Sequence, residues 1–286
     1  MTAFPLTIGT LSCLLLSTTL TAENTIQKRS IKANNVHVYH QLPPSVEDFS
    51  QMFSEGMFYG RIRSNTFNYV WEKEIENEQY NHTASGLGGS AIFKSGTFKD
   101  FDFTTALYGA YAFYDIKNDD VSRFRTGVDV MSRYNYVNDK EKHMLVLGEA
   151  FLNYSGFSKS NLRIGRQMVE GFSAKSNDTK MIPNTFDGIV LNSDAIDNTY
   201  FQLAYLTQQK LRSHTFSHAI LAVGDATSSN QIRPEWSEND DSAMHRGLTF
   251  SALKAKGLPT DSPLITAEVS NDSISNTNLK TAMYSV

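Results

Sequence analysis

The sequence has very little cysteine and, outside its first residues, no long apolar stretch. Among 286 residues there is a single cysteine, Cys13. Beyond the N-terminus no apolar run approaches the ~18 residues that a membrane helix needs, which excludes a helical membrane protein. Basic bias is also missing: the net charge is -4 and Lys and Arg do not cluster, which argues against nucleic acid as a partner.

The first 22 residues have the pattern of a secretory signal peptide. Residues 6–20 are apolar or small and uncharged, and residues 20–22 resemble a small-residue cleavage site. Cys13 lies inside this apolar core, and Thr10 stands where a lipoprotein site needs a Leu-type residue, so lipidation is not expected. We predict a signal peptide over 1–22 and an exported mature chain without a disulfide.

Residues 23–55 differ from the rest of the chain. The segment 23–44 is polar and lacks a clear periodicity, which predicts a mobile arm. A capping-box-like start at residues 45–48 is followed by apolar residues at helical spacing up to Phe53, and Gly56 can end the turn. This pattern predicts one short helix, for which packing at a domain edge and a plug or lid role are equally good interpretations.

From residue 56 onward the apolar period changes from 3.6 to 2. In residues 100–114, Phe101, Phe103, Leu107 and Phe113 share one face, and smaller or more polar residues share the other. A strand of this length exceeds the usual five or six residues and matches a membrane strand. The predicted strands are 58–64, 87–94, 100–114, 144–154, 161–167, 186–193, 199–208, 263–270 and 279–286, with 248–254 as a candidate extra strand.

The connections between these strands alternate between long and short. The long ones are 68–83, 115–143, 168–185 and 209–262, and the short ones are 95–99, 157–160, 194–198 and 271–278. A soluble sandwich has no reason to place every long loop at one end, whereas outer-membrane barrels have short periplasmic turns and long outer loops. The sequence therefore predicts an all-β fold, an antiparallel transmembrane β-barrel of the porin type.

Basic side chains lie on the polar faces of the predicted strands: Arg61, Arg63, Arg163 and Lys94. On a soluble sheet they would be ordinary solvated residues. In a barrel with apolar residues facing lipid, the same face points into the lumen, where guanidinium groups would attract carboxylates and offer bidentate hydrogen bonds. Arg166 breaks the alternation where its strand gives way to a loop, a position from which its side chain can turn inward.

Two further candidates complete this predicted lumen. Glu149 is expected to face the arginines across the pore. The polar segment 173–187 contains Asn177, Asp178 and Lys180, and its length is typical of functional loops. A surface loop and a constriction loop folded into the lumen are both compatible with this composition.

The sequence contains no motif for catalysis or for cofactor binding. His37 with His40, and His214 with His218, have helical ligand spacing but no accompanying cysteine or carboxylate set. The Ser-x-x-Lys match at 251–254 lacks its companion motifs, and no nucleophile elbow, phosphate loop or dinucleotide fingerprint is present. We therefore expect no enzyme activity, no catalytic residue, no metal site and no cofactor.

Two segments resemble the OprD-like (Opr) family of bacterial outer-membrane porins. Residues 161–167 leading into 176–188 resemble the family's strand and constriction loop, and residues 58–63 resemble its first strand. The resemblance implies an 18-stranded barrel, narrowed by the third long loop, with a lumenal basic ladder that guides carboxylate-bearing solutes. It gives the ladder role to Arg61, Arg63, Arg163 and Arg166, and the constriction role to Asn177, Asp178 and Lys180.

The chain departs from this family in length. About nine strands make half of such a barrel, and the sequence stops at Val286 in the middle of a strand, so we expect a truncated chain. The expected parts are a signal peptide (1–22), a periplasmic N-terminal arm with a short helix (23–55) and an incomplete barrel (56–286).

The expected function is passive diffusion of small hydrophilic, carboxylate-bearing solutes across the bacterial outer membrane. The expected partners are these solutes, outer-membrane lipid and the barrel-assembly machinery, with a homo-oligomer as an open alternative.

Two other functions are compatible with a β-rich exported chain. An exported soluble or surface β-protein used for binding or adhesion would pack the face of Phe103 and Phe113 against another sheet. A barrel hydrolase would need a converging Ser-His-carboxylate set, and no motif in the sequence indicates one.

Overall fold

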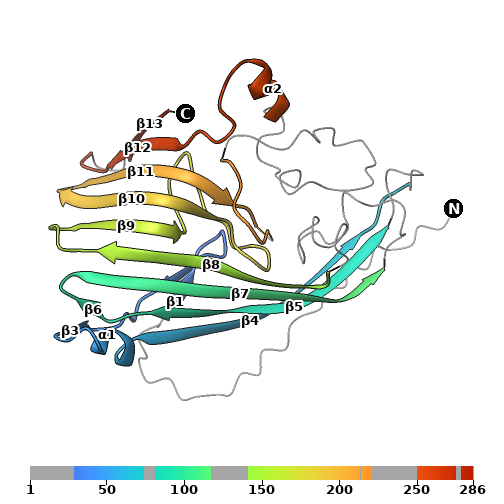
Figure 1. Ribbon diagram of the computed structural model, residues 1–286, viewed down its shortest axis with the longest axis horizontal. Helices are drawn as coiled ribbons and strands as arrows, with labels where there is room; N and C mark the ends of the chain where they lie inside the picture. The colour runs from blue at the N-terminus through green and yellow to red at the C-terminus, as the bar shows by residue number, and fades with distance from the viewer. Residues whose placement is uncertain are drawn as a thin grey trace.

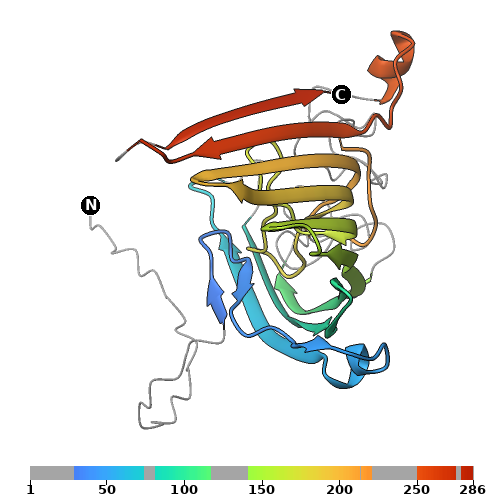
Figure 2. The ribbon, with the colours of Figure 1, turned by 90° about the vertical axis from the view of Figure 1, so that its left-hand side faces the viewer.

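A computed structural model describes residues 29–73, 81–116, 141–212, 214–220, 250–274 and 278–285. The main strands form one large curved sheet. Figure 1 shows the sheet from its convex side, and Figure 2 shows it from the side, so that its curvature is visible. The main strands are β4 (Met57–Tyr69), β5 (His82–Lys94), β7 (Phe101–Ile116), β8 (His143–Tyr154), β9 (Ser160–Gln167), β10 (Thr185–Ile196), β11 (Thr199–Lys210), β12 (Leu264–Asn271) and β13 (Leu279–Ser285).

All nine predicted strands are confirmed, and each is paired antiparallel with its neighbours in the order β13-β12-β11-β10-β9-β8-β7-β5-β4. The strands are long, with 13 residues in β4 and in β5 and 16 in β7. Within the described ranges, the edge strands β4 and β13 do not pair with each other, so the sheet is an open, curved wall. The short turns gather at the left end of Figure 1.

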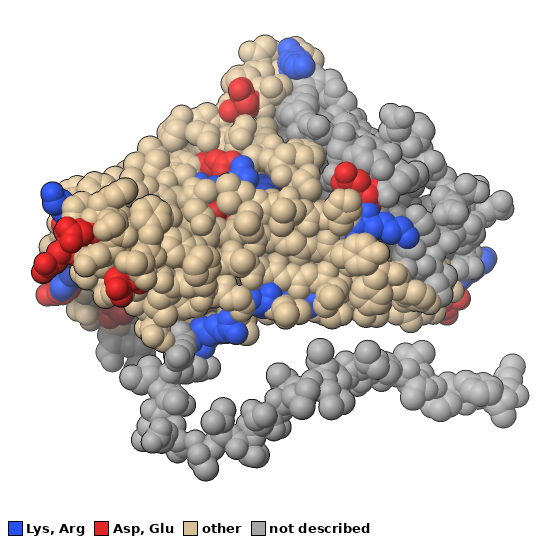
Figure 3. Space-filling model, turned by 60° about the horizontal axis from the view of Figure 1, so that its bottom comes forward, with Lys and Arg blue, Asp and Glu red and all other residues tan. Residues whose placement is uncertain are grey.

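The two faces of the wall differ as the alternation predicted. On the convex face large apolar side chains are exposed, with Ile62 85% exposed and Phe113 56% exposed. On the concave face Tyr108 is 1% exposed, and alanines of the same strand are buried beside it. Figure 3 shows part of the outer surface as a broad uncharged area, with charged residues mostly toward its margins.

This exposed face bears on the soluble alternative. Phe103 contacts the rings of Phe53 and Phe93, but among the described residues no second sheet covers the Phe113 face. A water-soluble sandwich would bury such a surface, since exposed apolar patches of this extent mark contact with lipid or a partner. Within the described residues, no helix combines the length and the apolar character needed to cross a membrane.

The concave side is filled by the connection between β9 and β10, residues 168–184. Met181 and Ile182 of this loop are fully buried against Tyr108, Met144 and Val146. Burying an apolar side chain of this size is worth about 1.5–3 kcal/mol, so these two residues contribute part of the free energy that holds the loop against the wall. The loop therefore packs on the inner side of the sheet.

The segment 23–44, for which we predicted a mobile arm, forms a hairpin over its described part. Strand β1 (Arg29–Ile31) pairs antiparallel with β2 (His37–Tyr39). The turn between them contains Asn35 at φ 60, a left-handed conformation that Asn tolerates better than most residues. Figure 2 shows this hairpin on the concave side of the sheet.

The predicted N-terminal helix is present but begins later than the capping-box pattern indicated. Ser45 and Val46 form β3 (Ser45–Val46), which pairs in parallel with β6 (Thr97–Phe98). The helix α1 (Gln51–Ser54) then has only four residues. The amides of Glu47 and Asp48 donate to the Gln51 side chain instead, both at 3.2 Å, so Gln51 accepts the bonds that the predicted cap would have accepted.

The candidate strand at 248–254 was wrong over its described part. Residues from Phe250 to Ala255 form helix α2 (Phe250–Ala255), and Gly257 at φ +68 ends it. Ala, Leu and Lys in this stretch are good helix formers, and a glycine in the left-handed conformation is a usual helix terminator. The predicted signal peptide lies outside the described residues.

Gly165 in β9 is a position where only glycine fits. Its φ is +124, and a Cβ there would collide with the Ala150 carbonyl of β8 and lie 3.0 Å from the Phe151 Cα. At Gly60 in β4, by contrast, a Cβ would meet nothing within 4 Å.

We therefore expect Gly165→Ala to lower the free energy of unfolding by about 1–3 kcal/mol, because a non-glycine residue is strained in this backbone conformation. Gly60→Ala is the matched control and should be neutral or slightly stabilising. Urea unfolding of the two variants in detergent measures this difference, and equal midpoints would contradict the prediction.

Candidate functional site

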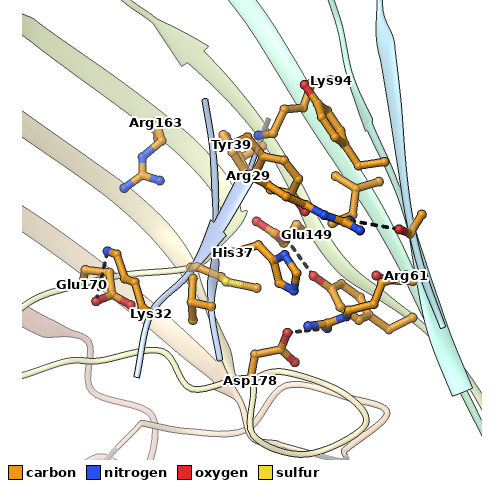
Figure 4. Close-up of a pocket in the computed structure, with 18 residues that line it drawn as sticks. Arg29, Lys32, His37, Tyr39, Arg61, Lys94, Glu149, Arg163, Glu170 and Asp178 are labelled. Carbon is orange, nitrogen blue, oxygen red and sulfur yellow. Dashed lines mark hydrogen bonds and ion pairs between the residues drawn. The ribbon is translucent and has the colours of Figure 1, made fainter. Parts of the chain in front are cut away.

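A cavity of about 300 Å³ lies between the N-terminal hairpin and the concave face of the sheet (Figure 4). Strands β4, β5, β7, β8 and β9 supply one wall, and the hairpin and the 168–184 loop supply the other. The charged and titratable residues around it are Arg29, Lys32, His37, Tyr39, Tyr59, Arg61, Lys94, Tyr108, Glu149, Arg163, Glu170 and Asp178. Three candidates from the sequence, Arg61, Arg163 and Glu149, are thus brought to one cavity, together with Asp178 of the loop.

Asp178 is the central ion-pair partner of the site. Its side chain is 2% exposed and forms ion pairs with Arg61 and with Arg63, the latter at 2.7 Å. Arg63 also donates to the Asp178 carbonyl at 2.9 Å and to the Met181 carbonyl at 2.6 Å. Two guanidinium groups of β4 therefore bind the loop to the wall through one buried carboxylate.

Glu149 reaches the cavity because of a register shift in β8. Ala106 pairs with Glu149 but Leu107 pairs with Leu147, which leaves Gly148 as an extra residue in the strand. Leu147 is exposed on the convex face, and the extra residue lets Glu149 and Phe151 both line the cavity. The Tyr108 hydroxyl donates to the Glu149 carboxylate at 3.1 Å.

Arg163 contributes a cation to the same cavity. Its guanidinium carbon lies 5.7 Å from the centre of the Phe151 ring, and its Nε is buried without a hydrogen-bond partner in the part of the chain that the structure describes. Lys94 lies near it on β5, donating to the Thr104 hydroxyl at 3.3 Å and stacking over the Tyr39 ring at 5.2 Å. Donor groups are therefore present at this wall of the cavity.

Arg166 does not line this cavity. Its guanidinium forms an ion pair with Asp187 at 2.7 Å and donates to the Leu147 carbonyl at 3.0 Å and to the Ser217 hydroxyl at 2.7 Å. These contacts tie β9 to β10 and to the 211–220 segment.

The other two loop candidates also lie apart from the cavity. The Asn177 side chain accepts hydrogen bonds from the Thr179 amide at 2.9 Å and from the Thr179 hydroxyl at 2.6 Å, an arrangement that shapes the loop. Lys180 is half-buried in the same loop. Of the three predicted constriction residues, Asp178 is the one that faces the hairpin and β4.

Sequence reasoning missed the part of the site that comes from the hairpin: Arg29, Lys32, His37 and Tyr39. Glu170, in the 168–184 loop, was missed as well. The hairpin segment shows no strand periodicity in the sequence, because each of its two strands has only three residues. The adjacent Asn34 and Asn35 were the one available signal, since such pairs favour tight hairpin turns.

The environment of the hairpin alters the acid-base properties of two of its residues. Burial, and then the positive charges of Arg61 and Arg29, lower the pKa of His37. Burial, and then the negative charge of Glu149, raise the pKa of Tyr39 to about 12. The hairpin thus docks with His37 and Tyr39 both uncharged near neutral pH.

The lowered pKa of His37 predicts a pH dependence of hairpin docking. In the docked state His37 faces Arg29 of the hairpin, Arg61 and Arg63 of β4, and Asp178 of the loop. Its pKa is lower docked than free, so protons bind preferentially to the undocked hairpin, and docking weakens as the pH falls below about 6.5. Protease cleavage within residues 29–41 should therefore increase on acidification. His37→Gln should remove that dependence, and cleavage that is independent of pH in the unmodified protein would contradict the prediction.

The buried ion pairs of Asp178 predict a second effect. Asp178→Asn leaves two arginine charges buried without their carboxylate, and such a loss costs about 3–5 kcal/mol. Because of this loss, we expect the 168–184 loop to detach from the wall more often. Faster proteolysis within the loop would measure this. Asp197→Asn is the control, because this side chain is 91% exposed and its pair with Lys159 is worth little. Equal proteolysis of the two variants would contradict the prediction.

Among the described residues no group of three or more His, Cys, Asp or Glu side chains is arranged to hold a metal ion. No curated protein matches the chain at a significant level. A family model does match it, over residues 152–251, and its description is an outer membrane porin of the OprD family. This segment includes the strand and loop on which the predicted resemblance rests.

Solved structures match the fold. OccAB3 of Acinetobacter baumannii has a TM-score of 0.57 at 13% identity, with 82% of this chain and 50% of that chain covered. OccAB4 of the same organism has a TM-score of 0.56 at 11% identity, covering 80% and 50%. OccK8 (OprE) of Pseudomonas aeruginosa has a TM-score of 0.51 at 14% identity, covering 80% and 45%.

The chain spans about half the length of the solved structures that it matches. The predicted fold, an antiparallel porin-type barrel sheet with about nine strands, is confirmed as an open wall. The predicted location, the bacterial outer membrane, is that of the matched family. The chain thus resembles the OprD family of bacterial outer membrane porins, in sequence over residues 152–251 and in fold over about 80% of its length.

Proposed function

We propose that this protein acts as an outer-membrane channel through which small hydrophilic solutes diffuse passively, without catalysis. The observation that carries the proposal is the contrast between the two faces of the wall. The convex face exposes Phe58, Ile62 and Leu145, which suits contact with outer-membrane lipid, while the concave face carries the charged cavity. A solute that moves along the concave face would meet charged groups and not the apolar side chains of the convex face.

We further propose that the channel favours solutes with a carboxylate. The cavity lining contains five Lys or Arg residues and three acidic residues. Asp178 already pairs with Arg61, whereas the Arg163 guanidinium has donor capacity to spare. A carboxylate in the cavity would accept hydrogen bonds from that group, in the bidentate geometry that arginine provides.

In the same proposal the 168–184 loop narrows the passage. Asp178 fastens the loop to β4, and Asn177 shapes its backbone through Thr179. Lys180 keeps its predicted place in the constriction. Arg166 keeps its predicted role in guiding solutes, from its separate cluster with Asp187 and Ser217. The barrel-assembly machinery and a homo-oligomer remain proposed partners by virtue of the matched family.

Ion selectivity tests the role of Arg163. The purified protein is reconstituted in planar lipid bilayers and its reversal potential is measured in a KCl gradient. Arg163→Gln should reduce the preference for anions about threefold, since a unit charge about 6 Å from the ion path contributes about 0.7 kcal/mol in water. The matched control is Lys159→Gln, which removes one positive charge from an exposed turn and should leave the selectivity unchanged.

Two results would count against the proposal. Absence of any conductance from correctly folded protein would contradict a channel function. A conductance whose selectivity is the same in Arg163→Gln and Lys159→Gln would contradict the carboxylate preference but leave the channel intact.

A further inference from the structure

The N-terminal hairpin occupies the passage that the proposed function requires. It lies on the concave side of the sheet and forms one wall of the cavity, facing Arg61, Glu149 and Arg163 (Figures 2 and 4). Val36, at its turn, is buried with 6% exposure. Any solute that moves along the concave face beside these three residues must pass the hairpin.

One end of the hairpin is held by polar contacts to the 168–184 loop. The Asn34 side chain donates to the Glu170 carboxylate and to the Ser176 carbonyl, both at 2.9 Å. Lys32 forms an ion pair with Glu170 at 3.5 Å, and the Asp178 amide donates to the Asn34 carbonyl at 2.9 Å. The loop that carries the buried carboxylate of the site is therefore also the docking surface of the hairpin.

The other end of the hairpin is held by strand β4. Arg29 donates to the Gly60 carbonyl at 3.1 Å, and the Tyr59 hydroxyl donates to the Gln41 carbonyl. The Tyr39 ring packs on the Tyr59 ring with 4.3 Å between centroids. These contacts come from side chains, since neither β1 nor β2 joins the hydrogen-bonded ladder of the large sheet.

This mode of attachment makes the hairpin separable from the wall. A two-stranded hairpin with three residue pairs is not stable by itself in water, so its order depends on the docking contacts. Each of those hydrogen bonds contributes modestly, and none belongs to the sheet. The segment at residues 40–44, with Pro43 and Pro44, links the hairpin to β3 and leaves the sheet unchanged if the hairpin moves.

We propose that the β1–β2 hairpin is an intramolecular plug: docked between the 168–184 loop and β4 it obstructs the passage past Arg61, Glu149 and Arg163, and released it opens that passage. The inference rests on the proposed channel function. The plug is thus a segment of this chain, and Arg29, Lys32 and Asn34 hold it in the docked position. A fixed brace for the loop would use the same contacts, and the experiment separates the two roles.

The test compares docking and conductance in the same proteins. The release variant is Lys32→Ala/Asn34→Ala, which removes the contacts with Glu170 and Ser176 and leaves the cavity-lining residues of the sheet in place. A second variant lacks residues 29–39 altogether. The control is Lys159→Ala, at an exposed turn far along the sequence from the hairpin. Docking is followed in a Val36→Cys background with Cys13→Ser, through the rate at which a thiol reagent labels the buried position.

The expected result has two parts. Labelling at position 36 should be slow in the control and at least about tenfold faster in the release variant, which loses two hydrogen bonds and one ion pair. Single-channel conductance or open probability should rise in the release variant and rise further in the deletion, with the control unchanged.

Three results would overturn the inference. Rapid labelling in the Val36→Cys/Cys13→Ser protein that carries no further substitution would show that the hairpin is not docked. Faster labelling in the release variant with unchanged or lower conductance in both hairpin variants would assign it a bracing role, and the proposed channel function would stand. No conductance from any of the folded proteins would overturn the proposed function itself, and the plug with it.

Discussion

The arrangement of the inner face depends on one buried carboxylate. Asp178 sits between Arg61 and Arg63, and the three side chains are largely withdrawn from solvent. Each charge would be costly to bury alone, so the loop and the strand are stable in this position only together. Because Asp178 also offers its backbone amide to Asn34, the same residue sets the position of the hairpin. Loop, wall and hairpin thus share one electrostatic centre.

Apolar contacts next to these ion pairs fix how closely the 168–184 loop approaches the wall. Met181 and Ile182, three and four residues after Asp178 in the chain, pack against Tyr108 and Met144. Small residues on β7 and β5 leave the room for this approach: at Gly88 a Cβ would lie 2.6 Å from the Met181 side chain. The loop therefore lies against the wall through shape as well as charge, and the charged cavity forms beside it.

Strand alternation explains why charge and apolar surface separate so completely. Successive side chains point to opposite faces, so Arg61 and Arg63 face inward while Ile62 faces outward. A bulge at Gly148 then changes the phase within β8 and brings Glu149 to the inner face. One extra residue in one strand thus supplies the cavity with the acid that accepts the Tyr108 hydrogen bond.

The sequence by itself determined the strands, their two faces and the alternation of turns and loops, because these depend on local periodicity. It also determined the likeness to an outer-membrane porin family, because that likeness lies in one continuous segment, residues 152–251. It also indicated Arg61, Arg63, Arg163 and Asp178, which stand on a regular polar face or in a distinctive loop. The ion-pair partners, the separate location of Arg166 and the hairpin were decided only by tertiary structure. Asp178 meets Arg61 across more than a hundred residues, and Asn34 meets Glu170 across a similar distance. Contacts of that kind leave no local pattern, since they depend on the curvature of the sheet that brings the segments together.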